Sequence, residues 1–280
     1  MKLKKIILYY PSFERGGVEN ILINISNFFL KKKVKLDIVT SQKIIKKNNN
    51  LKYYLIEKKN KRIITSLLSI SVLLKTLVIN YKDRGKTCIL SLQSNTIAIL
   101  LGKILGYRVA IRNSEYPLGS LLTLDDNIFK TFLVFFQKIF FYNFANLIIS
   151  NSQGSRDTIR KFIINKKKVI YIYNPYLKKI FKENKKYRKN IILFVGRFVE
   201  QKGIKYLLDA FSMFEKKKRN FELWMVGSGP EIKRIKDFKS EKNLKNKIKL
   251  FNWQNDLSKF YKNAKYFVLP SIYEGLGNVV

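Results

Sequence analysis

Short apolar runs alternate with amphipathic stretches along the chain. The first run, Leu3 to Tyr10, predicts a strand, and apolar side chains then recur at helical spacing between Val18 and Phe29. Residues 36–40 predict a second strand. A strand, a helix and a further strand within about forty residues imply that the two strands pair in parallel through a right-handed crossover.

This alternation continues to residue 173 and starts again at residue 191. We therefore expect an α/β fold with two Rossmann-like, doubly wound domains. Asn174-Pro175 interrupts regular structure, so we assign residues 1–175 to an N-terminal domain, the lysine-rich residues 176–190 to a linker and residues 191–280 to a C-terminal domain. The expected strands are 88–92, 108–112, 146–150, 169–173, 191–195, 222–226, 247–251 and 266–269, and the expected helices are 97–105, 155–162, 204–214, 231–239 and 257–262.

Two apolar stretches, residues 63–79 and 128–149, could be mistaken for membrane spans. Neither is an uninterrupted run of about 20 apolar residues, because Lys75 lies in the first and Lys130 and Lys138 lie in the second. Two interpretations stay open for them. They are buried or half-buried helices of an α/β domain, or one of them lies on the inner leaflet of a membrane with lysines on its flank.

Composition limits the classes of protein and partner. The chain has 280 residues and is 46% hydrophobic, which is enough for a sizeable core and excludes disorder as its main state. Its formal charge of +37 favours a partner with phosphate or anionic lipid. We discount a nucleic-acid partner, because the excess of Lys, Asn, Ile, Phe and Tyr resembles a coding bias and no nucleic-acid-binding motif is present.

The chain has one cysteine, Cys88, and no histidine. A disulfide within the chain and a clustered thiolate metal site are therefore excluded. A reducing cytoplasm is the best-fitting location.

The most selective candidate site is the loop from Gly196 to Gly203. Arg197 and Lys202 lie five residues apart between a strand end and a helix start, so both cations can converge on one diphosphate. An ordinary lysine-rich turn is the alternative. Lys202 alone would mean little in this chain, but Arg197 directly after Gly196 is more selective.

Two further loops follow expected strands. Gly227 and Gly229 would let a flat or phosphorylated ligand approach the backbone, although a tight turn before a helix gives the same pattern. In the last loop, Glu274 precedes a glycine turn, and free amides from about Gly277 onward would lie at a helix N-terminus. A capping role would explain Glu274 but not the whole run from Pro270 to Asn278.

Five motifs in order resemble glycosyltransferase family 4 over the whole chain. This resemblance implies the GT-B fold, in which two Rossmann-like domains face a cleft, and transfer of a sugar from a nucleotide-sugar with retention of anomeric configuration. It implies no metal or other cofactor. The motifs are Gly16-Gly17-Val18-Glu19, Asn174-Pro175, Val195-Gly196-Arg197 with Gln201-Lys202-Gly203, Val226 to Pro230, and Pro270 to Gly275.

The resemblance also implies roles for single residues. Arg197 and Lys202 would hold the donor diphosphate in place of a metal ion. Glu274 resembles the first member of the family's pair of glutamates separated by seven residues, which contacts hydroxyls of the donor sugar. The other implied positions are Gly196, Gly227, Gly229, Gly277 and Asn278 on the donor side, Gly16 and Gly17 facing the distal phosphate, and Asn113 and Glu115 bordering the acceptor.

By this resemblance, we expect transfer of a hexose-type sugar to a glycan or lipid-linked acceptor in surface polysaccharide or lipopolysaccharide assembly. The chain departs from the family in two ways. The acceptor-side loop lacks the usual histidine, a position that Arg112 or Asn113 would fill, and the second glutamate of the pair would fall two positions beyond Val280. We therefore expect a C-terminally truncated second domain.

Three other functions stay open beside the active enzyme. A catalytically inactive remnant of such an enzyme is the strongest. A basic nucleic-acid-binding protein ranks below it. A dinucleotide-dependent oxidoreductase ranks low, because the first turn lacks the pattern Gly-x-Gly-x-x-Gly.

Overall fold

A computed structural model describes residues 3–11, 17–43, 45–46, 48–57, 62–114, 116–119, 128–175, 188–217, 220–254 and 256–277. The chain forms two compact units, which are described separately. The first contains Met1–Leu177 and Gly275–Asn278, and the second contains Lys178–Glu274 and Val279–Val280.

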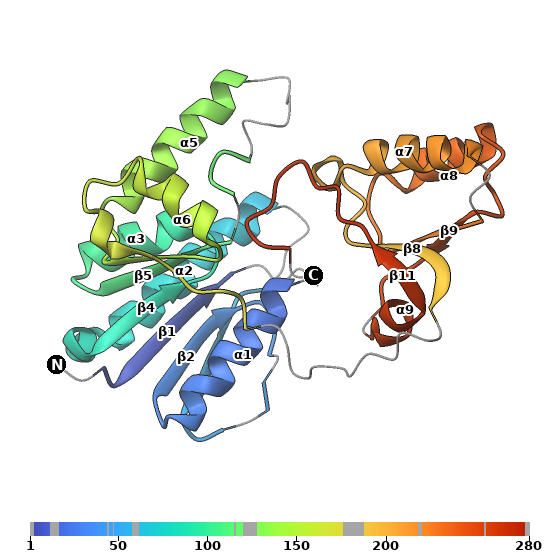
Figure 1. Ribbon diagram of the computed structural model, residues 1–280. Coiled ribbons are helices and arrows are strands. Elements are labelled where there is room, and N and C mark those ends of the chain that lie inside the picture. Colours follow the sequence, from blue (N-terminus) through green and yellow to red (C-terminus); the bar gives the residue numbers. More distant parts are fainter. Residues whose placement is uncertain are drawn as a thin grey trace. The chain divides into compact units, whose positions relative to one another are not determined.

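The first unit is built on a seven-stranded sheet in which every pairing is parallel (Figure 1). The strand order is β3-β2-β1-β4-β5-β6-β7, so the chain winds outward in both directions from the centre. The strands are β1 (Lys5–Tyr10), β2 (Lys35–Thr40), β3 (Leu51–Leu55), β4 (Thr87–Ser91), β5 (Arg108–Asn113), β6 (Leu147–Ser150) and β7 (Val169–Tyr171).

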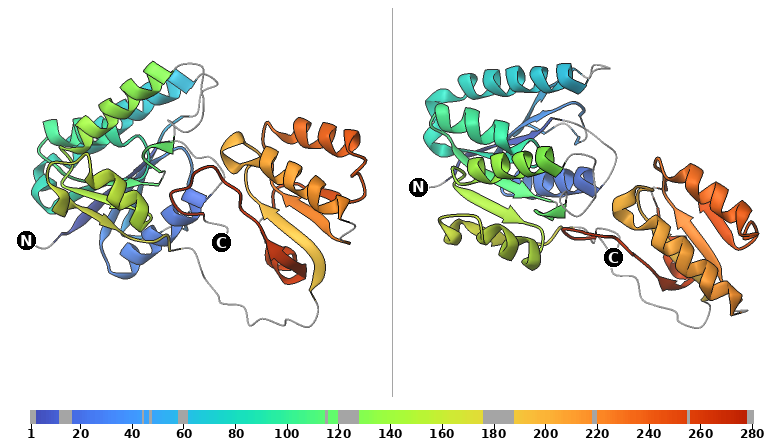
Figure 2. Two further views of the ribbon diagram at one scale, coloured as in Figure 1. Left: turned by 45° about the horizontal axis from the view of Figure 1, so that its top comes forward. Right: turned by 90° about the horizontal axis from the view of Figure 1, so that it is seen from above.

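Helices cover both faces of this sheet (Figures 1 and 2). On one face Leu22 of α1 packs with Leu8 and Ile38 of the sheet. On the other face Leu73 and Leu77 of α2 pack against strand residues. The helices are α1 (Gly17–Lys31), α2 (Arg62–Ile79), α3 (Asn95–Ile104), α5 (Ile128–Tyr142) and α6 (Gln153–Arg160), and the 3-10 turns are η1 (Tyr81–Lys86) and η2 (Lys166–Lys168).

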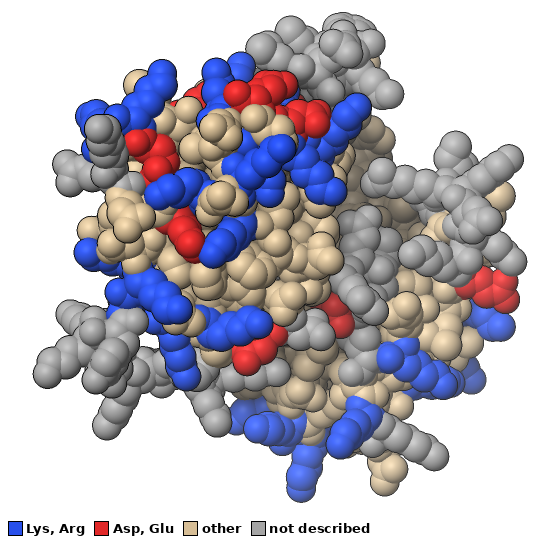
Figure 3. All heavy atoms as spheres, turned by 90° about the vertical axis from the view of Figure 1, so that its right-hand side faces the viewer, with Lys and Arg blue, Asp and Glu red and all other residues tan. Residues whose placement is uncertain are grey.

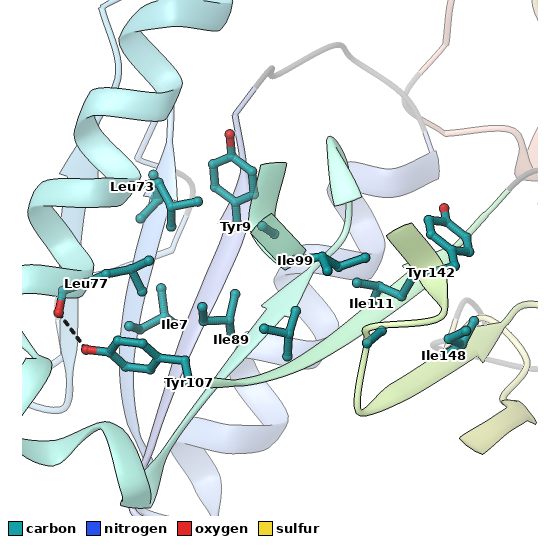
Figure 4. Packing of buried hydrophobic residues seen from close by; sticks show 14 of the residues in the cluster. Ile7, Tyr9, Leu73, Leu77, Ile89, Ile99, Tyr107, Ile111, Tyr142 and Ile148 are labelled. Atoms are coloured by element: carbon teal, nitrogen blue, oxygen red, sulfur yellow. Dashed lines mark hydrogen bonds between the residues drawn. The ribbon is translucent and has the colours of Figure 1, made fainter. Parts of the chain in front are cut away.

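The core on the α2 face contains tyrosines whose hydroxyl groups have partners (Figure 4). Tyr107 donates a hydrogen bond to the Leu77 carbonyl oxygen, and the Tyr9 hydroxyl lies 3.0 Å from Ser69 Oγ. Burial raises the pKa of both tyrosines to about 12. Both hydroxyls therefore stay protonated at neutral pH and link α2 to the sheet.

The second unit contains a four-stranded parallel sheet in the order β10-β9-β8-β11. Alternate residues of its central strand face opposite sides. Phe194 packs with the core that contains Leu208 and Ile235, whereas Leu193 packs with Phe260. The elements are β8 (Lys189–Val195), η4 (Glu200–Lys202), α7 (Ile204–Lys216), β9 (Glu222–Val226), α8 (Ile232–Glu241), β10 (Ile248–Phe251), α9 (Ser258–Asn263) and β11 (Ala264–Phe267).

The predicted α/β class with parallel, doubly wound sheets is confirmed within each unit. The strand β3 was not predicted, and it pairs only with β2 at the edge of the sheet. Of the two apolar stretches, the first forms α2 and the second forms α5 followed by β6. Within the described ranges, no helix has the length and apolar character that crossing a membrane requires.

Candidate functional site

Three of the predicted site loops lie at one edge of the second sheet. They follow β8, β9 and β11, and because these strands are parallel, their carboxyl ends meet at the same edge. Strand β8 has β9 on one side and β11 on the other, so the strand order reverses there. Ligands of open α/β sheets bind at such a switch point.

The loops after β8 and β9 are packed backbone to backbone. Phe198 N donates to Ser228 O at 2.8 Å, and Glu231 N donates to Phe198 O at 3.0 Å. Gly229 has φ +155°, and a Cβ at this position would lie 2.4 Å from the carbonyl oxygen of Phe198. The glycine therefore permits this close approach of the two loops. The sequence did not indicate this packing role.

The loop after β8 is equally close to the loop after β11. Gly203 has φ +66°, and a Cβ there would lie 2.0 Å from the carbonyl oxygen of Pro270. Gln201 joins the same two loops, because its carbonyl oxygen accepts from Ile272 N at 2.9 Å and its Nε2 donates to Tyr273 O at 3.1 Å. The sequence motif contained Gln201 but gave no signal for this role.

Two predicted site residues meet here, since Lys202 Nζ forms an ion pair with Glu274 Oε1. Ser271 Oγ donates to the same carboxylate oxygen at 2.9 Å. The side chains of Lys202 and Glu274 are 13% and 23% exposed, so the pair is largely screened from water. The hydroxyl of Ser271, three residues before Glu274, is a functional candidate that the sequence reasoning missed.

Arg197 differs from Lys202 in its surroundings. It follows Gly196 directly after β8, is exposed, and makes no hydrogen bond or ion pair with any part of the chain that the structure describes. A guanidinium group has five N–H donors in a planar fork that matches phosphate oxygens. This edge of the sheet therefore presents one cation ready for an anion and a second cation held by a carboxylate.

The remaining predicted positions are spread over the two units. Gly227 packs against the Gly196 carbonyl, Gly277 lies in irregular backbone, and Gly17 begins α1. Asn113, at the end of β5, is 2% exposed, and its Nδ2 lies 3.4 Å from Ser155 Oγ. Gly16, Glu115 and Asn278 lie outside the described residues, so the predicted helix N-terminus at Gly277 stays a prediction.

Next to Asn113, Arg112 is 4% exposed. Its guanidinium donates hydrogen bonds to Ser114 Oγ and Asn174 Oδ1, and burial lowers its pKa to about 10. It has no carboxylate partner within the described residues. Arg112 therefore stays positively charged at neutral pH. If Arg112 fills the place of the family's histidine, it brings a permanent positive charge to that place.

Among the described residues, no group of three or more His, Cys, Asp and Glu side chains could hold a metal ion. Metal independence itself stays a prediction.

Comparison with solved structures identifies the class of fold. The chain resembles the crystal structure of a mutant of TarM from Staphylococcus aureus in complex with fondaparinux, alpha-GlcNAc-glycerol and UDP, with a TM-score of 0.72 and 13% sequence identity over 98% of this chain and 82% of that chain. The predicted GT-B fold class is thereby confirmed.

Comparison with sequence families agrees with the predicted resemblance. Residues 176–280 match the family model described as glycosyl transferases group 1. An uncharacterised glycosyltransferase of Methanocaldococcus jannaschii is 28% identical over 220 residues, which are 73% of this chain and 52% of that protein. The resemblance to glycosyltransferases is therefore confirmed.

The name of a second relative specifies a reaction. The N-acetylgalactosamine-N,N'-diacetylbacillosaminyl-diphospho-undecaprenol 4-alpha-N-acetylgalactosaminyltransferase of Campylobacter jejuni is 26% identical over 186 residues, 65% of this chain and 50% of that enzyme. The chain thus spans about half the length of these two relatives.

Proposed function

We propose that this chain is a glycosyltransferase that binds a nucleotide-sugar at the carboxyl edge of the second sheet. The observation that carries the proposal is the contact between Lys202 and Glu274, which lie 72 residues apart in the sequence. The resemblance to glycosyltransferase family 4 implies a role for Lys202 at the diphosphate and for Glu274 at the sugar. Their contact, in the loop after β8 that also carries Arg197, supports a single site for both parts of a donor.

The charges of this edge suit the departure of a nucleoside diphosphate. When the bond between the anomeric carbon and the phosphate oxygen breaks, its electron pair goes to that oxygen and negative charge grows on the diphosphate. Arg197 and Lys202 would stabilise this charge, and such preorganised electrostatic contacts are usually the largest contribution to catalysis. Glu274 would accept hydrogen bonds from hydroxyls of the donor sugar.

We further propose that transfer proceeds with retention and without a metal ion. The departing phosphate oxygen would take the proton of the acceptor hydroxyl on the face where the new glycosidic bond forms. This step needs no protein base, and the sequence offers no histidine for one. Transfer in the presence of EDTA at an unchanged rate is the expected result.

For the acceptor, we propose a glycan or a lipid-linked sugar of a surface polysaccharide or lipopolysaccharide. The name of the Campylobacter jejuni relative, which specifies a diphospho-undecaprenol acceptor, supports this class. We place the reaction in the cytoplasm, for which the single cysteine is the supporting observation.

The face of the molecule seen in Figure 3 gives no support to the nucleic-acid alternative. On the face seen in Figure 3, Lys and Arg side chains lie in many separate places, with Asp and Glu beside several of them. A nucleic-acid backbone is normally bound by a continuous basic stripe.

The proposed function is tested by incubating the chain with a panel of UDP-, GDP- and ADP-sugars and measuring release of the nucleoside diphosphate. We expect slow release from at least one donor in water and faster release when a suitable acceptor is added. No release from any donor would contradict the proposal. Binding of a diphosphate without release would instead favour the inactive remnant.

Replacing Glu274 by Gln should strengthen binding of UDP roughly two- to fivefold, the factor that corresponds to losing one ion pair that competes for Lys202. The same change should slow release from the sugar donor, because the amide replaces the carboxylate that would contact the sugar. Calorimetric titration and the release assay measure the two effects. Asp209→Asn, which removes an exposed carboxylate from α7, is the matched control. A weaker affinity for UDP in the Glu274→Gln variant would show that Glu274 does not compete for Lys202.

A further inference from the structure

Helix α5 is buried on one side only. Phe135, Ile139 and Tyr142 are 5%, 8% and 2% exposed and pack on the first unit. The other described apolar side chains of the helix are mainly exposed. A surface helix normally carries polar side chains on its outer face.

The outward apolar side chains form a stripe. Phe132, Phe136, Phe140 and Phe144 follow one another at intervals of four residues and are 49%, 49%, 60% and 51% exposed. The ring centroids of Phe132 and Phe136 lie 4.4 Å apart, and those of Phe140 and Phe144 lie 5.3 Å apart. We call these four residues the phenylalanine stripe. A contiguous exposed apolar patch of this kind marks an interaction surface.

The segment 161–168 packs against α5 and the turn that follows it. The Phe162 ring lies 5.2 Å from that of Phe135, and Ile164 N donates to Asn143 Oδ1 at 2.9 Å. Ile164 is 90% exposed. It therefore adds an outward apolar side chain next to the carboxyl end of α5.

Positive charge gathers at the same place. Lys161, Lys166 and Lys167 flank Ile164 and are exposed. Lys168 Nζ donates to Asn143 O at 2.6 Å, and its pKa is lowered by burial and by the nearby charge of Lys103. Neither residues 128–144, which comprise α5 and the turn that carries Phe144, nor the segment 161–168 contains an acidic residue. An anionic partner would relieve this repulsion.

We propose that the phenylalanine stripe and the segment 161–168 dock this chain on an anionic lipid bilayer. The aromatic side chains and Ile164 would enter the boundary between headgroups and acyl chains, and Lys161, Lys166 and Lys167 would contact headgroup phosphates. A bilayer offers an apolar layer directly beneath a layer of negative charge, which is the order of groups that this surface matches. A second copy of the chain would instead bring a further set of lysines to a molecule whose net charge is already +37.

This surface belongs to the first unit, and none of its residues is a predicted donor-site residue. The proposal is therefore independent of the transfer reaction. Its test decides between the two interpretations that the sequence left open for residues 128–149.

The test is flotation of the full chain with vesicles of phosphatidylcholine alone or with about one third phosphatidylglycerol. We expect binding to the anionic vesicles at least tenfold stronger than to the neutral ones, and weaker binding as salt is raised. Phe136→Ser with Phe140→Ser should lower the partition coefficient at least tenfold. Lys166→Gln with Lys167→Gln should lower binding to anionic vesicles and leave binding to neutral vesicles unchanged.

Matched controls lie at the carboxyl end of α1, where Phe28 is 56% exposed, and Lys31 and the following Lys32 are exposed. Phe28→Ser, and Lys31→Gln with Lys32→Gln, should bind as the unchanged chain does. Thermal unfolding of every variant checks that folding is retained. Phe140→Trp adds a measurement on the folded chain, since brominated lipid should quench the fluorescence of the new indole. Absence of binding to anionic vesicles would overturn the proposal, as would equal losses in the controls. Self-association that depends on Phe136 and Phe140, without vesicle binding, would assign the surface to a second copy instead.

Discussion

Replacing Arg197 and Lys202 together by alanine is expected to lower the affinity of this chain for UDP at least a hundredfold. A hydrogen bond to a charged group contributes about 1.5–3 kcal/mol, so the loss of two corresponds to roughly 3–6 kcal/mol and to two to four powers of ten in the dissociation constant. Arg197 should account for the larger part, because Lys202 exchanges its ion pair with Glu274 for the phosphate. Calorimetric titration of the double variant and of each single variant measures how much Arg197 and Lys202 each contribute to the affinity for UDP.

The control for this prediction must change the net charge equally. Lys205 and Lys216 are exposed on α7 in the same unit, and their joint replacement by alanine also removes two positive charges. At physiological salt, charges away from the site are screened, and we expect affinity within about twofold of the unchanged chain. An equal loss in both double variants would attribute binding to net charge and would contradict the assignment of Arg197 and Lys202.

Gly203→Ala is expected to lower the free energy of unfolding of the second unit by about 2–4 kcal/mol. The left-handed backbone conformation alone costs a residue with a Cβ roughly 1–2 kcal/mol, and the contact of the new Cβ with the Pro270 carbonyl oxygen adds backbone displacement. Because the loop after β11 would have to move, the contact between Lys202 and Glu274 should also be lost. Urea unfolding, followed by the fluorescence of Trp224 and Trp253, reports on this unit, since both tryptophans of the chain lie in it.

Gly154→Ala is the control, because it also adds a Cβ to a glycine but creates no close contact. Gly154 lies in α6, and an added Cβ would meet no atom within 4 Å. Alanine favours a helix over glycine by about 0.5–1 kcal/mol, so this variant should be as stable as the unchanged chain or slightly more stable. Circular dichroism during urea unfolding measures it. A Gly203→Ala variant with unchanged stability would show that the loops after β8 and β11 do not pack as described.

Most of the fold could be predicted from local patterns, because a parallel strand buried on both faces is a continuous apolar run. Residues 191–195 are such a run and form the greater part of β8. Strand β3 was not predicted, because Lys52 interrupts it. It lies at the edge of the described sheet next to β2, so its sequence lacks the apolar continuity of a central strand.

The site could be predicted in part. Arg197, Lys202 and Glu274 could be chosen because they directly follow expected strands, and parallel strands bring such loops to one edge. The role of Gln201 could not be predicted, since its partners, Ile272 and Tyr273, lie in another loop and are contacted largely through backbone atoms. The ion pair between Lys202 and Glu274 likewise depends on the packing of Gly203 against Pro270.

The sequence could not show which face of α5 is exposed, for a different reason. Apolar residues occur on every side of this helix, so its sequence periodicity does not say which side packs on the sheet. Only the tertiary structure shows that Phe135 and Ile139 are buried and that Phe136 and Phe140 are exposed.

Calorimetric titration of the unchanged chain with nucleotides tests the central claim most directly, namely that the carboxyl edge of the second sheet binds a diphosphate group. Saturable heat and a raised melting temperature are predicted with at least one of UDP, GDP and ADP, and neither effect with the corresponding nucleoside. Absence of both effects with all three diphosphates would contradict the account.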